Sequence, residues 1–474
     1  MAASPGPGVA NFSKSTGRPE PDPRRFGYWA GHLVVVGSMI GVGILTTSGY
    51  TLQATGNPIA LLGLWAVGGV LALCGAVTVA ELATTVPRSG GDYVFVREAF
   101  GRRAGFVSGW ATFTLGFAAP TAIVAHLAIK SLTDPFVTAL EGVLPGWASA
   151  QIVPLGATLL ILAVGFGHTL GHRHSSKLQA TATLVTVGVL LALGVGGIAF
   201  GRGDWNYLSA GGWPTAGQWP ALAVGLVFVM YSYSGWNAAA YLAGEVRDPA
   251  RVLPRCLIGG VVTVIALYLL VNLAYVYALD PVEMRDKKEV GQVAELAVIA
   301  LFGKEVGWVT AIVIGLSLSA SVSAYLLTGP RVAFAMARDR VFPGFAAELH
   351  PTRGTPAAAT LTQAIIAAAL VWSGSFLELL TYTSVGLAAL SGLTIASVFP
   401  LRRRADVVQP YRLPLYPLPP LAYLILTAWT IAAMVADPQE RKPALYSLAT
   451  VLLGVPLSWL LPSESTPSVE AAKS

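Results

Sequence analysis

Apolar residues fill most of this chain in long blocks, and short polar connections separate the blocks. Each block approaches the roughly 20 residues that an α-helix needs to cross the hydrocarbon core of a bilayer. Twelve blocks lie at about 30–51, 59–85, 104–129, 150–170, 177–200, 219–243, 254–279, 305–333, 356–373, 377–400, 416–436 and 443–461. The pattern predicts an all-α integral membrane protein with twelve transmembrane helices.

The composition supports a membrane protein. Of the 474 residues, 54% are hydrophobic and 11% are charged, whereas charged residues make up about 25% of a typical soluble domain. The 51 glycines fit a bundle in which transmembrane helices approach closely. Cys74 and Cys256 lie within or beside apolar blocks without metal-ligand spacing, so we expect neither a disulfide framework nor a metal site. These values argue against a soluble enzyme and a nucleic-acid-binding domain.

The basic residues between the blocks predict the orientation. If the N-terminus is cytoplasmic, the inner connections hold 22 of the 30 Lys and Arg residues and the outer connections hold 8. An inner excess is the distribution that the positive-inside rule describes. Both termini are therefore predicted to lie on the cytoplasmic side of the plasma membrane. Arg outnumbers Lys in the chain, which favours a prokaryotic source.

The segments outside the blocks complete the domain organisation. Residues 1–26 are small, polar and rich in Pro and Gly, which predicts a disordered cytoplasmic arm. Residues 463–474 form a short cytoplasmic tail, so 27–462 is expected to be a single membrane domain. The apolar stretch 290–302 is too short to span, and we expect a helical cap over the outer face there. An ordinary solvated loop is the alternative.

Polar and small residues interrupt two of the blocks at their centres. The first block contains Gly37-Ser38-Met39-Ile40-Gly41-Val42-Gly43, and the sixth contains Tyr231-Ser232-Tyr233-Ser234-Gly235-Trp236-Asn237. Glycine inside a helix costs about 1 kcal/mol relative to alanine, and backbone freed at membrane depth must be buried in protein or line a wet cavity. We expect a break in both helices. Close helix packing alone, through the GxxxG pattern of the first stretch, is the alternative.

Breaks in the first and sixth helices predict an internal repeat. Corresponding interruptions in two halves of a chain are typical of transporters built from inverted repeats. The repeats would cover about 30–200 and 219–400, and the two helices of 416–461 would be appended.

The two breaks offer complementary charges. The N-terminus of a half-helix presents free N–H groups and a partial positive charge, which suit a carboxylate. Unwound carbonyl groups suit an ammonium group, and a zwitterionic α-amino acid needs both. The predicted function is therefore transport of α-amino acids by alternating access, with neutral substrates favoured because no charged side chain lies at the centre of a block. A sensor of the same architecture without significant flux is the alternative. An enzyme is not expected, since HExxH and GxSxG motifs are absent from the sequence.

Further motifs carry a family resemblance. They are Ala80-Glu81-Leu82-Ala83-Thr84-Thr85, Ser89-Gly90-Gly91-Asp92-Tyr93, Gly244-Glu245-Val246-Arg247-Asp248-Pro249, Leu253-Pro254, Thr328-Gly329-Pro330-Arg331 and Ala335-Met336-Ala337-Arg338-Asp339. Together with the two interrupted stretches, they make the chain resemble the amino acid–polyamine–organocation superfamily, and within it the L-amino-acid-transporter-like permeases. The resemblance implies a LeuT-type fold with a 5+5 inverted repeat and two C-terminal helices.

The resemblance also implies a substrate site. The substrate carboxylate would meet the backbone N–H groups of Val42 and Gly43, and the ring of Tyr231 would cover the substrate as a gate. The substrate amine would meet the carbonyl groups of Met39, Tyr231 and Ser234. Polar contacts beneath the side-chain pocket would come from Asn237. The remaining residues of the predicted site are Ile40, Gly41, Ser232, Gly235 and Trp236.

Two positions depart from the family pattern. Many relatives carry Ser at the position of Val42, and this difference should alter affinity rather than substrate class. Relatives commonly carry Lys at the position of Thr186, where the amine is thought to support exchange or proton coupling. One hypothesis places a Na⁺ ion there, because hard cations prefer oxygen ligands. Its ligands would be Thr186, Ser319 or Ser323, and the carbonyl of Gly37. In the alternative, Thr186 bonds its own helix and transport is uncoupled or coupled elsewhere.

Other polar residues and possible partners complete the expectations. Glu81 and Glu245, near the inner ends of their blocks, are expected to serve structural pairing or an inner gate. Glu378 is expected at the membrane interface, and His126 is expected to pack. The family's disulfide-linked heavy subunit is not expected, because the connection 131–149 contains no Cys. Apart from the possible Na⁺, no cofactor is expected.

Overall fold

The computed structural model describes residues 27–88, 90–137, 145–170, 175–285, 292–350, 355–404 and 408–461. These residues form helices joined by turns, and no β-strand is found among them. The predicted arm 1–26 and the predicted tail 463–474 lie outside the described residues.

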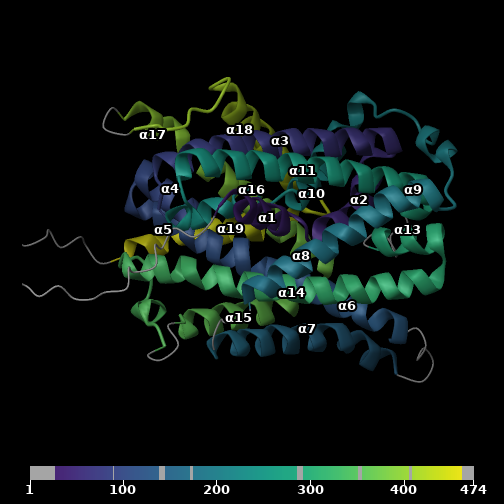
Figure 1. The fold of residues 1–474 in the computed structure, drawn as a ribbon, viewed down its shortest axis with the longest axis horizontal. Helices are drawn as coiled ribbons and strands as arrows, with labels where there is room; N and C mark the ends of the chain where they lie inside the picture. The colour runs from purple at the N-terminus through teal and green to yellow at the C-terminus, as the bar shows by residue number, and fades with distance from the viewer. Residues whose placement is uncertain are drawn as a thin grey trace, which may run out of the picture.

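The first half of the chain forms the helices α1 to α9, and the first break lies between α1 and α2 (Figure 1). They are α1 (Tyr28–Met39), α2 (Val42–Thr55), α3 (Pro58–Thr85), α4 (Asp92–Phe100), α5 (Arg102–Ala111), α6 (Ala119–Val137), α7 (Gly146–Thr169), α8 (Ser175–Leu191) and α9 (Gly197–Phe200). Two π-helical segments, Thr112–Ala118 and Ala192–Gly196, join α5 to α6 and α8 to α9.

The second half begins after two short 3₁₀ turns, Trp205–Ser209 and Ala216–Gln218. Its elements are α10 (Trp219–Ser232), the 3₁₀ helix η6 (Ala238–Glu245), α11 (Pro249–Ala278), α12 (Pro281–Met284), α13 (Val293–Phe302), α14 (Lys304–Arg338), a 3₁₀ turn (Gly344–Ala347), α15 (Ala357–Val371), α16 (Phe376–Ala396), α17 (Val398–Arg403), α18 (Leu418–Ala436) and α19 (Arg441–Trp459).

These helices support a multi-pass membrane protein. Each of the twelve predicted blocks contains a described helix. Among the described residues, eight helices are long and apolar enough to cross a membrane, and the bent pair of α1 and α2 makes nine. The helices α10 and α15 are apolar but shorter. The all-helical membrane architecture is confirmed, and the count of twelve spans stays a prediction.

Both predicted breaks are present. The axes of α1 and α2 differ by 44°, and the chain between them is extended at Ile40 and Gly41. The sixth block ends its α-helix at Ser232, passes through Gly235 with a left-handed φ of 95°, and continues as η6. A 3₁₀ stretch within a helical segment often marks a hinge, because its hydrogen bonds are tighter and poorer than those of an α-helix.

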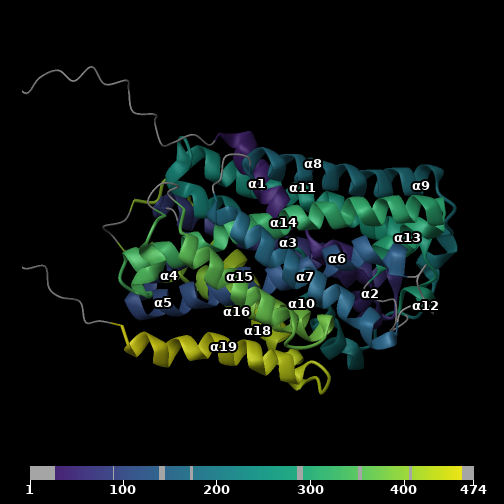
Figure 2. The same ribbon diagram turned by 90° about the horizontal axis from the view of Figure 1, so that it is seen from below.

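The long helices pack in two groups, and the helices that contain the breaks belong to the first. The first group contains α1, α2, α3, α10 and α11, and the second contains α6, α7, α14 and α15. In Figures 1 and 2, α4 and α5 lie at one end of the bundle, and α9 and α13 lie at the other. This arrangement agrees with the predicted orientation, in which α4 is cytoplasmic and α13 lies outside.

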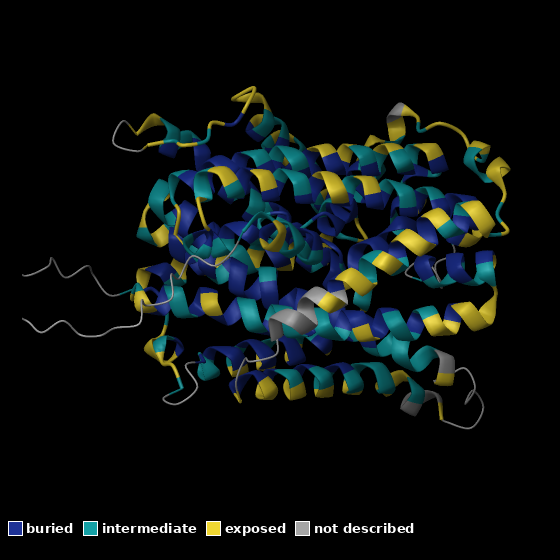
Figure 3. Ribbon diagram, viewed as in Figure 1, coloured by how far each residue is buried: buried dark blue, intermediate teal, exposed yellow. Residues whose placement is uncertain are grey.

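Exposed residues lie on the outer faces of the helices (Figure 3), and many of them are large and apolar. On α7, Leu155, Leu159, Leu162 and Phe166 are exposed. Their spacing places them on one helix face. An exposed apolar face of this kind suits contact with lipid chains.

The predicted cap is confirmed as a helix. The described part of the stretch forms α13, which packs against α14, α2 and α11. Its residues Val293, Ala297 and Val298 are buried, so hydrophobic burial holds the short helix against the bundle. The interpretation as an ordinary solvated loop is wrong.

Two predicted structural roles for ionisable side chains are also found, and a third ionisable side chain caps a helix. Glu81 is 2% exposed; it accepts from the Leu413 amide at 2.7 Å and pairs with Arg402 at 3.4 Å. The carboxylate of Glu378 belongs to a capping box at the start of α16, and the ring of His126 packs on Phe376 with the centroids 5.6 Å apart. These contacts confirm structural pairing for Glu81 and packing for His126.

Substitution of Gly235 by Ala should destabilise the protein. An added Cβ would collide with the backbone of Ser38 and would sit at a positive φ, a conformation that costs a non-glycine residue about 1–3 kcal/mol. We expect Gly235→Ala to lower the melting temperature of the detergent-solubilised protein. Gly188→Ala in α8 is the control, since open space surrounds that position. Equal melting temperatures of the two variants would contradict the close contact of the two breaks.

Candidate functional site

The two breaks lie back to back, and glycine makes this contact possible. A Cβ on Gly43, in the first turn of α2, would collide with Ser232 at the end of α10. A Cβ on Gly235 would collide with the carbonyl of Ser38 in α1. Because each glycine faces the backbone of the other break, the predicted pairing of the two stretches is observed directly.

The N-terminus of α2 is buried at the first break. It begins at Val42 after the extended residue Gly41, and no side chain among the described residues caps it. The first N–H groups of an α-helix have no partner within the helix. Both Val42 and Gly43 are buried, so these N–H groups face an environment of low dielectric constant. This end of α2 can bind an anion such as a carboxylate.

Ser232 uses its side chain to join the two broken helices. Its hydroxyl lies 2.7 Å from the hydroxyl of Thr47 and 2.8 Å from the carbonyl of Phe228, and the Thr47 hydroxyl lies 2.9 Å from the carbonyl of Gly43. Because each hydroxyl has one proton, one of the two donates to the other, and the second donates to the carbonyl of its own helix. These bonds tie α10 to α2, so the structure gives the Ser232 hydroxyl a role in positioning the site.

Tyr268 of α11 lies between the carbonyl groups of the two breaks. Its hydroxyl is 2.6 Å from the carbonyl oxygen of Met39 and 3.1 Å from that of Ser232. The side chain is fully buried and packs against Trp65 and Tyr233. Freed carbonyl groups at membrane depth need a donor, and this phenol supplies one. The sequence shows that a donor is needed but not that Tyr268 provides it.

Tyr231 and Ser234, two further residues of the predicted site, lie at the second break. Tyr231, the last residue of α10 but one, is 7% exposed, and its carbonyl accepts from the amide of Ser234 at 2.9 Å. Each carbonyl oxygen has two lone pairs, so those of Met39 and Tyr231 retain capacity for a substrate amine. The structure therefore brings Met39, Ile40, Gly41, Val42, Gly43, Tyr231, Ser232, Ser234 and Gly235 together at the paired breaks.

Trp236 and Asn237 point elsewhere. The indole of Trp236 packs against Gly75 of α3 and lies 6.1 Å from the ring of Tyr423 in α18. The amide nitrogen of Asn237 lies 3.0 and 3.1 Å from the carboxylate oxygens of Asp92 in α4. In this structure both side chains contact neighbouring helices, away from the break of α1 and α2.

A small pocket adjoins the first break. Ile40, Gly41 and Leu45 line it together with Thr186 of α8, Ser317 and Ser321 of α14, and apolar residues of both helices. Its cavity volume is about 10 Å³, which is the space that one water molecule needs. Thr186 therefore lies beside the break, within a mostly apolar wall.

The other predicted cation ligands are not at this pocket's wall. Ser319 donates to the carbonyl of Gly315 at 2.8 Å, and the hydroxyl of Ser323 lies 2.9 Å from Nε2 of His168. Gly37 packs against Thr183, one turn before Thr186. Ser317 and Ser321 take the places beside Thr186 that the sequence analysis assigned to Ser319 or Ser323.

Asp92 is a buried carboxylate that the sequence analysis did not assign to the site. It is 2% exposed and begins α4. Besides Asn237, the hydroxyl of Tyr241 donates to it at 2.8 Å. Burial raises the pKa of Asp92, and the hydrogen bonds from Tyr241 and Asn237 oppose this shift.

Comparisons with known proteins agree with this geometry. The family model described as amino acid permease matches residues 26–455. The chain is 27% identical over 442 residues to Asc-type amino acid transporter 1 of Mus musculus, covering 90% of this chain and 79% of that protein. It is 28% identical over 440 residues to Large neutral amino acids transporter small subunit 2 of Rattus norvegicus, covering 90% and 78%.

A bacterial relative is similar to the same degree. Serine/threonine exchanger SteT of Bacillus subtilis is 28% identical over 396 residues, which cover 82% of this chain and 86% of that protein. These proteins are transporters, and the family model covers most of the chain. With two broken helices paired at its centre, the chain belongs to the amino acid permease family of the amino acid–polyamine–organocation superfamily and is a transporter, not an enzyme.

Proposed function

We propose that this protein is a secondary transporter that moves neutral α-amino acids across the membrane by alternating access. The observation that carries the proposal is the contact between the buried N-terminus of α2 and the unwound end of α10. One break offers N–H groups and both offer carbonyl groups. A zwitterion of the size of an amino acid backbone can use both kinds of group at once.

In the proposed binding mode, the substrate carboxylate accepts hydrogen bonds from the N–H groups of Val42 and Gly43. The substrate ammonium group donates to the carbonyl groups of Met39 and Tyr231, and Ser234 contributes a third carbonyl. Tyr231 closes over the substrate as a gate. The hydroxyl of Tyr268 keeps the carbonyl groups of both breaks oriented, because it is buried and fixed by its aromatic neighbours.

Neutral substrates are favoured by the wall of the pocket beside the first break. It consists of apolar side chains and the hydroxyl groups of Thr186, Ser317 and Ser321. A charged substrate side chain would meet no opposite charge there, and burying an unpaired charge is costly. The names of two relatives, for large neutral amino acids and for serine and threonine, point to the same class.

We further propose that the protein exchanges amino acids without Na⁺. A hard cation prefers a shell of oxygen ligands, whereas the wall around Thr186 is mostly apolar. The bacterial relative is named an exchanger. The competing proposal is Na⁺ symport with the ion beside Thr186, and the same experiment tests both.

The setting proposed for transport follows from the sequence. We propose that both termini lie in the cytoplasm and that the protein lies in the plasma membrane; the distribution of basic residues among the connections supports this orientation. Two inverted repeats, 30–200 and 219–400, would move relative to each other around the breaks. The protein would work without a disulfide-linked subunit, and Arg usage favours a prokaryotic cell.

Counterflow tests the function and its alternative. Proteoliposomes loaded with unlabelled leucine, serine or threonine should accumulate the corresponding labelled amino acid from outside. Lysine and glutamate should not compete, because their side chains carry a charge. Saturable binding without accumulation would favour a sensor instead, and competition by charged amino acids would contradict the proposed neutral selectivity.

Replacement of external Na⁺ by choline tests the coupling. We expect the initial rate of exchange to stay unchanged, because the proposed substrate contacts include no cation. The rate is measured as uptake of labelled substrate into preloaded proteoliposomes at equal ionic strength. A rate that falls several-fold in choline and returns with Na⁺ would support the ion beside Thr186.

Tyr268→Phe tests the role of the buried phenol. Removal of the hydroxyl leaves carbonyl groups of the breaks without their donor, a change that costs about 1–3 kcal/mol in a buried site. We expect KM for uptake to rise about tenfold. Tyr277→Phe is the control, because its hydroxyl reaches only the carbonyl of Gly201, at 3.4 Å. Equal KM values in Tyr268→Phe and the parent would contradict this role.

A further inference from the structure

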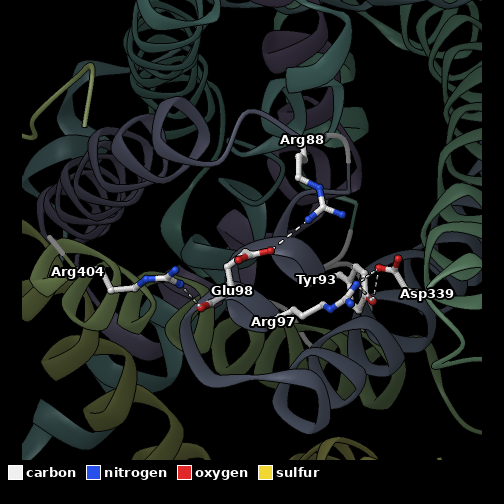
Figure 4. A network of polar contacts seen from close by, with 6 residues as sticks. All are labelled: Arg88, Tyr93, Arg97, Glu98, Asp339 and Arg404. Atoms are coloured by element: carbon white, nitrogen blue, oxygen red, sulfur yellow. Dashed lines mark hydrogen bonds and ion pairs between the residues drawn. The ribbon is translucent and has the colours of Figure 1, made fainter. Parts of the chain in front are cut away.

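The helix α4 is anchored to the second helix group. Arg97 forms an ion pair with Asp339, which follows α14, and the hydroxyl of Tyr93 donates to the same carboxylate at 2.8 Å (Figure 4). In addition, α4 packs against α5, whose first residue Arg102 donates to the carbonyl of Arg340 at 2.7 Å. Through these contacts α4 and the end of α14 form one unit.

The residues at the start of α4 face the other helix group. Gly91, at a φ of 53°, lies close enough to the ring of Tyr241 that a Cβ would collide with it. The amide of Gly90 donates to the carbonyl of Tyr241 at 3.4 Å. Next in the chain, Asp92 accepts from Asn237 and from the hydroxyl of Tyr241. The turn 90–92 therefore docks on η6 and the residue before it.

The contact of Asp92 crosses between the two groups. η6 packs against α1, α3 and α11, which belong to the first group, while α4 is fixed to α14 of the second. Asp92 is 2% exposed, and its carboxylate accepts hydrogen bonds from the side-chain amide of Asn237 and the phenol of Tyr241. A buried carboxylate depends strongly on such donors, since losing them leaves a desolvated charge.

We propose that Asp92 is a positioning residue of the transport cycle: its carboxylate holds η6 against α4, keeps this end of the transporter closed, and releases η6 when this end opens. The proposal rests on the proposed function, because alternating access requires the two groups to separate at one end at a time. The predicted orientation makes this the cytoplasmic end. Asn237, two residues after Gly235, links the contact to the break at the substrate site.

The same helix offers a matched control. Glu98 pairs with Arg88 at 3.1 Å, and the side chains of both are partly exposed, 33% for Glu98 and 55% for Arg88. Arg404 also reaches the backbone carbonyl of Glu98 at 3.4 Å (Figure 4). These contacts lie on α4 but do not involve η6. Glu98→Gln therefore changes a charge on α4 without touching the proposed contact between groups.

Distance measurements between spin labels test the proposal. Labels are attached to cysteines at Arg251, at the start of α11, and at Arg338, at the end of α14, with Cys74 and Cys256 replaced. Both positions are exposed, and they report on the two groups. We expect Asp92→Ala to add a population with a longer distance, and Tyr241→Phe to do so to a smaller extent. The Glu98→Gln distribution should match the parent.

Other outcomes are decisive as well. If folded Asp92→Ala protein gives the same distance distribution as the parent, the proposal is overturned. A lower melting temperature would not rescue it, because a purely structural role of Asp92 would also lower the melting temperature. If Asp92→Ala proves too unstable to measure, Asp92→Asn takes its place, because it keeps the size of the side chain and an acceptor for Tyr241. We expect its distance distribution to lie between that of the parent and a distribution with the longer distance. If Asp92→Asn and Glu98→Gln change the distance distribution to the same extent, the specific role of the Asp92 contact is overturned.

Transport assays separate this proposal from the proposed function. Counterflow by the parent protein tests the function alone, while the distance measurement needs no transported substrate. If the parent transports amino acids, Asp92→Ala should raise KM for external substrate about tenfold in right-side-out proteoliposomes. Fewer molecules are then closed at the inner end, so fewer can open to the outside and bind external substrate. An unchanged KM together with unchanged distances would leave the function standing and remove the proposed role of Asp92.

Discussion

The structure depends on one constraint: backbone N–H and carbonyl groups within a bilayer must find partners inside the protein. Two helices of this permease break at their centres, and each break frees such groups. The protein buries these groups by placing the breaks against each other. Gly43 and Gly235 permit the close approach, and the hydroxyl of Tyr268 donates to freed carbonyl groups. In the proposed binding mode, the N–H groups at the start of α2 bind the substrate carboxylate.

This arrangement explains why few charged side chains are needed at the centre. Partial charges of the backbone are fixed by the helices themselves and need no counterion, whereas a side-chain charge at this depth would be costly. Ion pairs such as that of Arg97 and Asp339 lie at the end where α4 lies, and the pair of Lys130 and Asp134 lies near the end of α6. Charged side chains thus pair where the helix groups meet, and the proposed substrate site relies on backbone dipoles.

The sequence predicted the helical blocks, the two breaks and the cap α13, because these depend on local composition along the chain. It did not predict which face of a helix turns inward. In a membrane helix, lipid and protein neighbours are both apolar, so the usual contrast between faces is weak. Ser317 and Ser321 line the pocket, whereas Ser319 was predicted. A shift of two residues turns a side chain by about 200° around the helix. For the same reason Tyr268, Asp92 and the direction of Asn237 required the structure.

The stretch from Tyr231 to Asn237 connects the second break with the contact at Asp92. Its first residues lie at the break, and its last residue contacts Asp92. Because Gly235 turns the chain between them, movement at one end is transmitted over only a few residues of backbone. A substrate that binds one arrangement of this stretch more tightly shifts the balance between arrangements by its difference in affinity, and by no more. Coupling between binding and opening at the α4 end therefore needs no titrating group at the centre of the membrane.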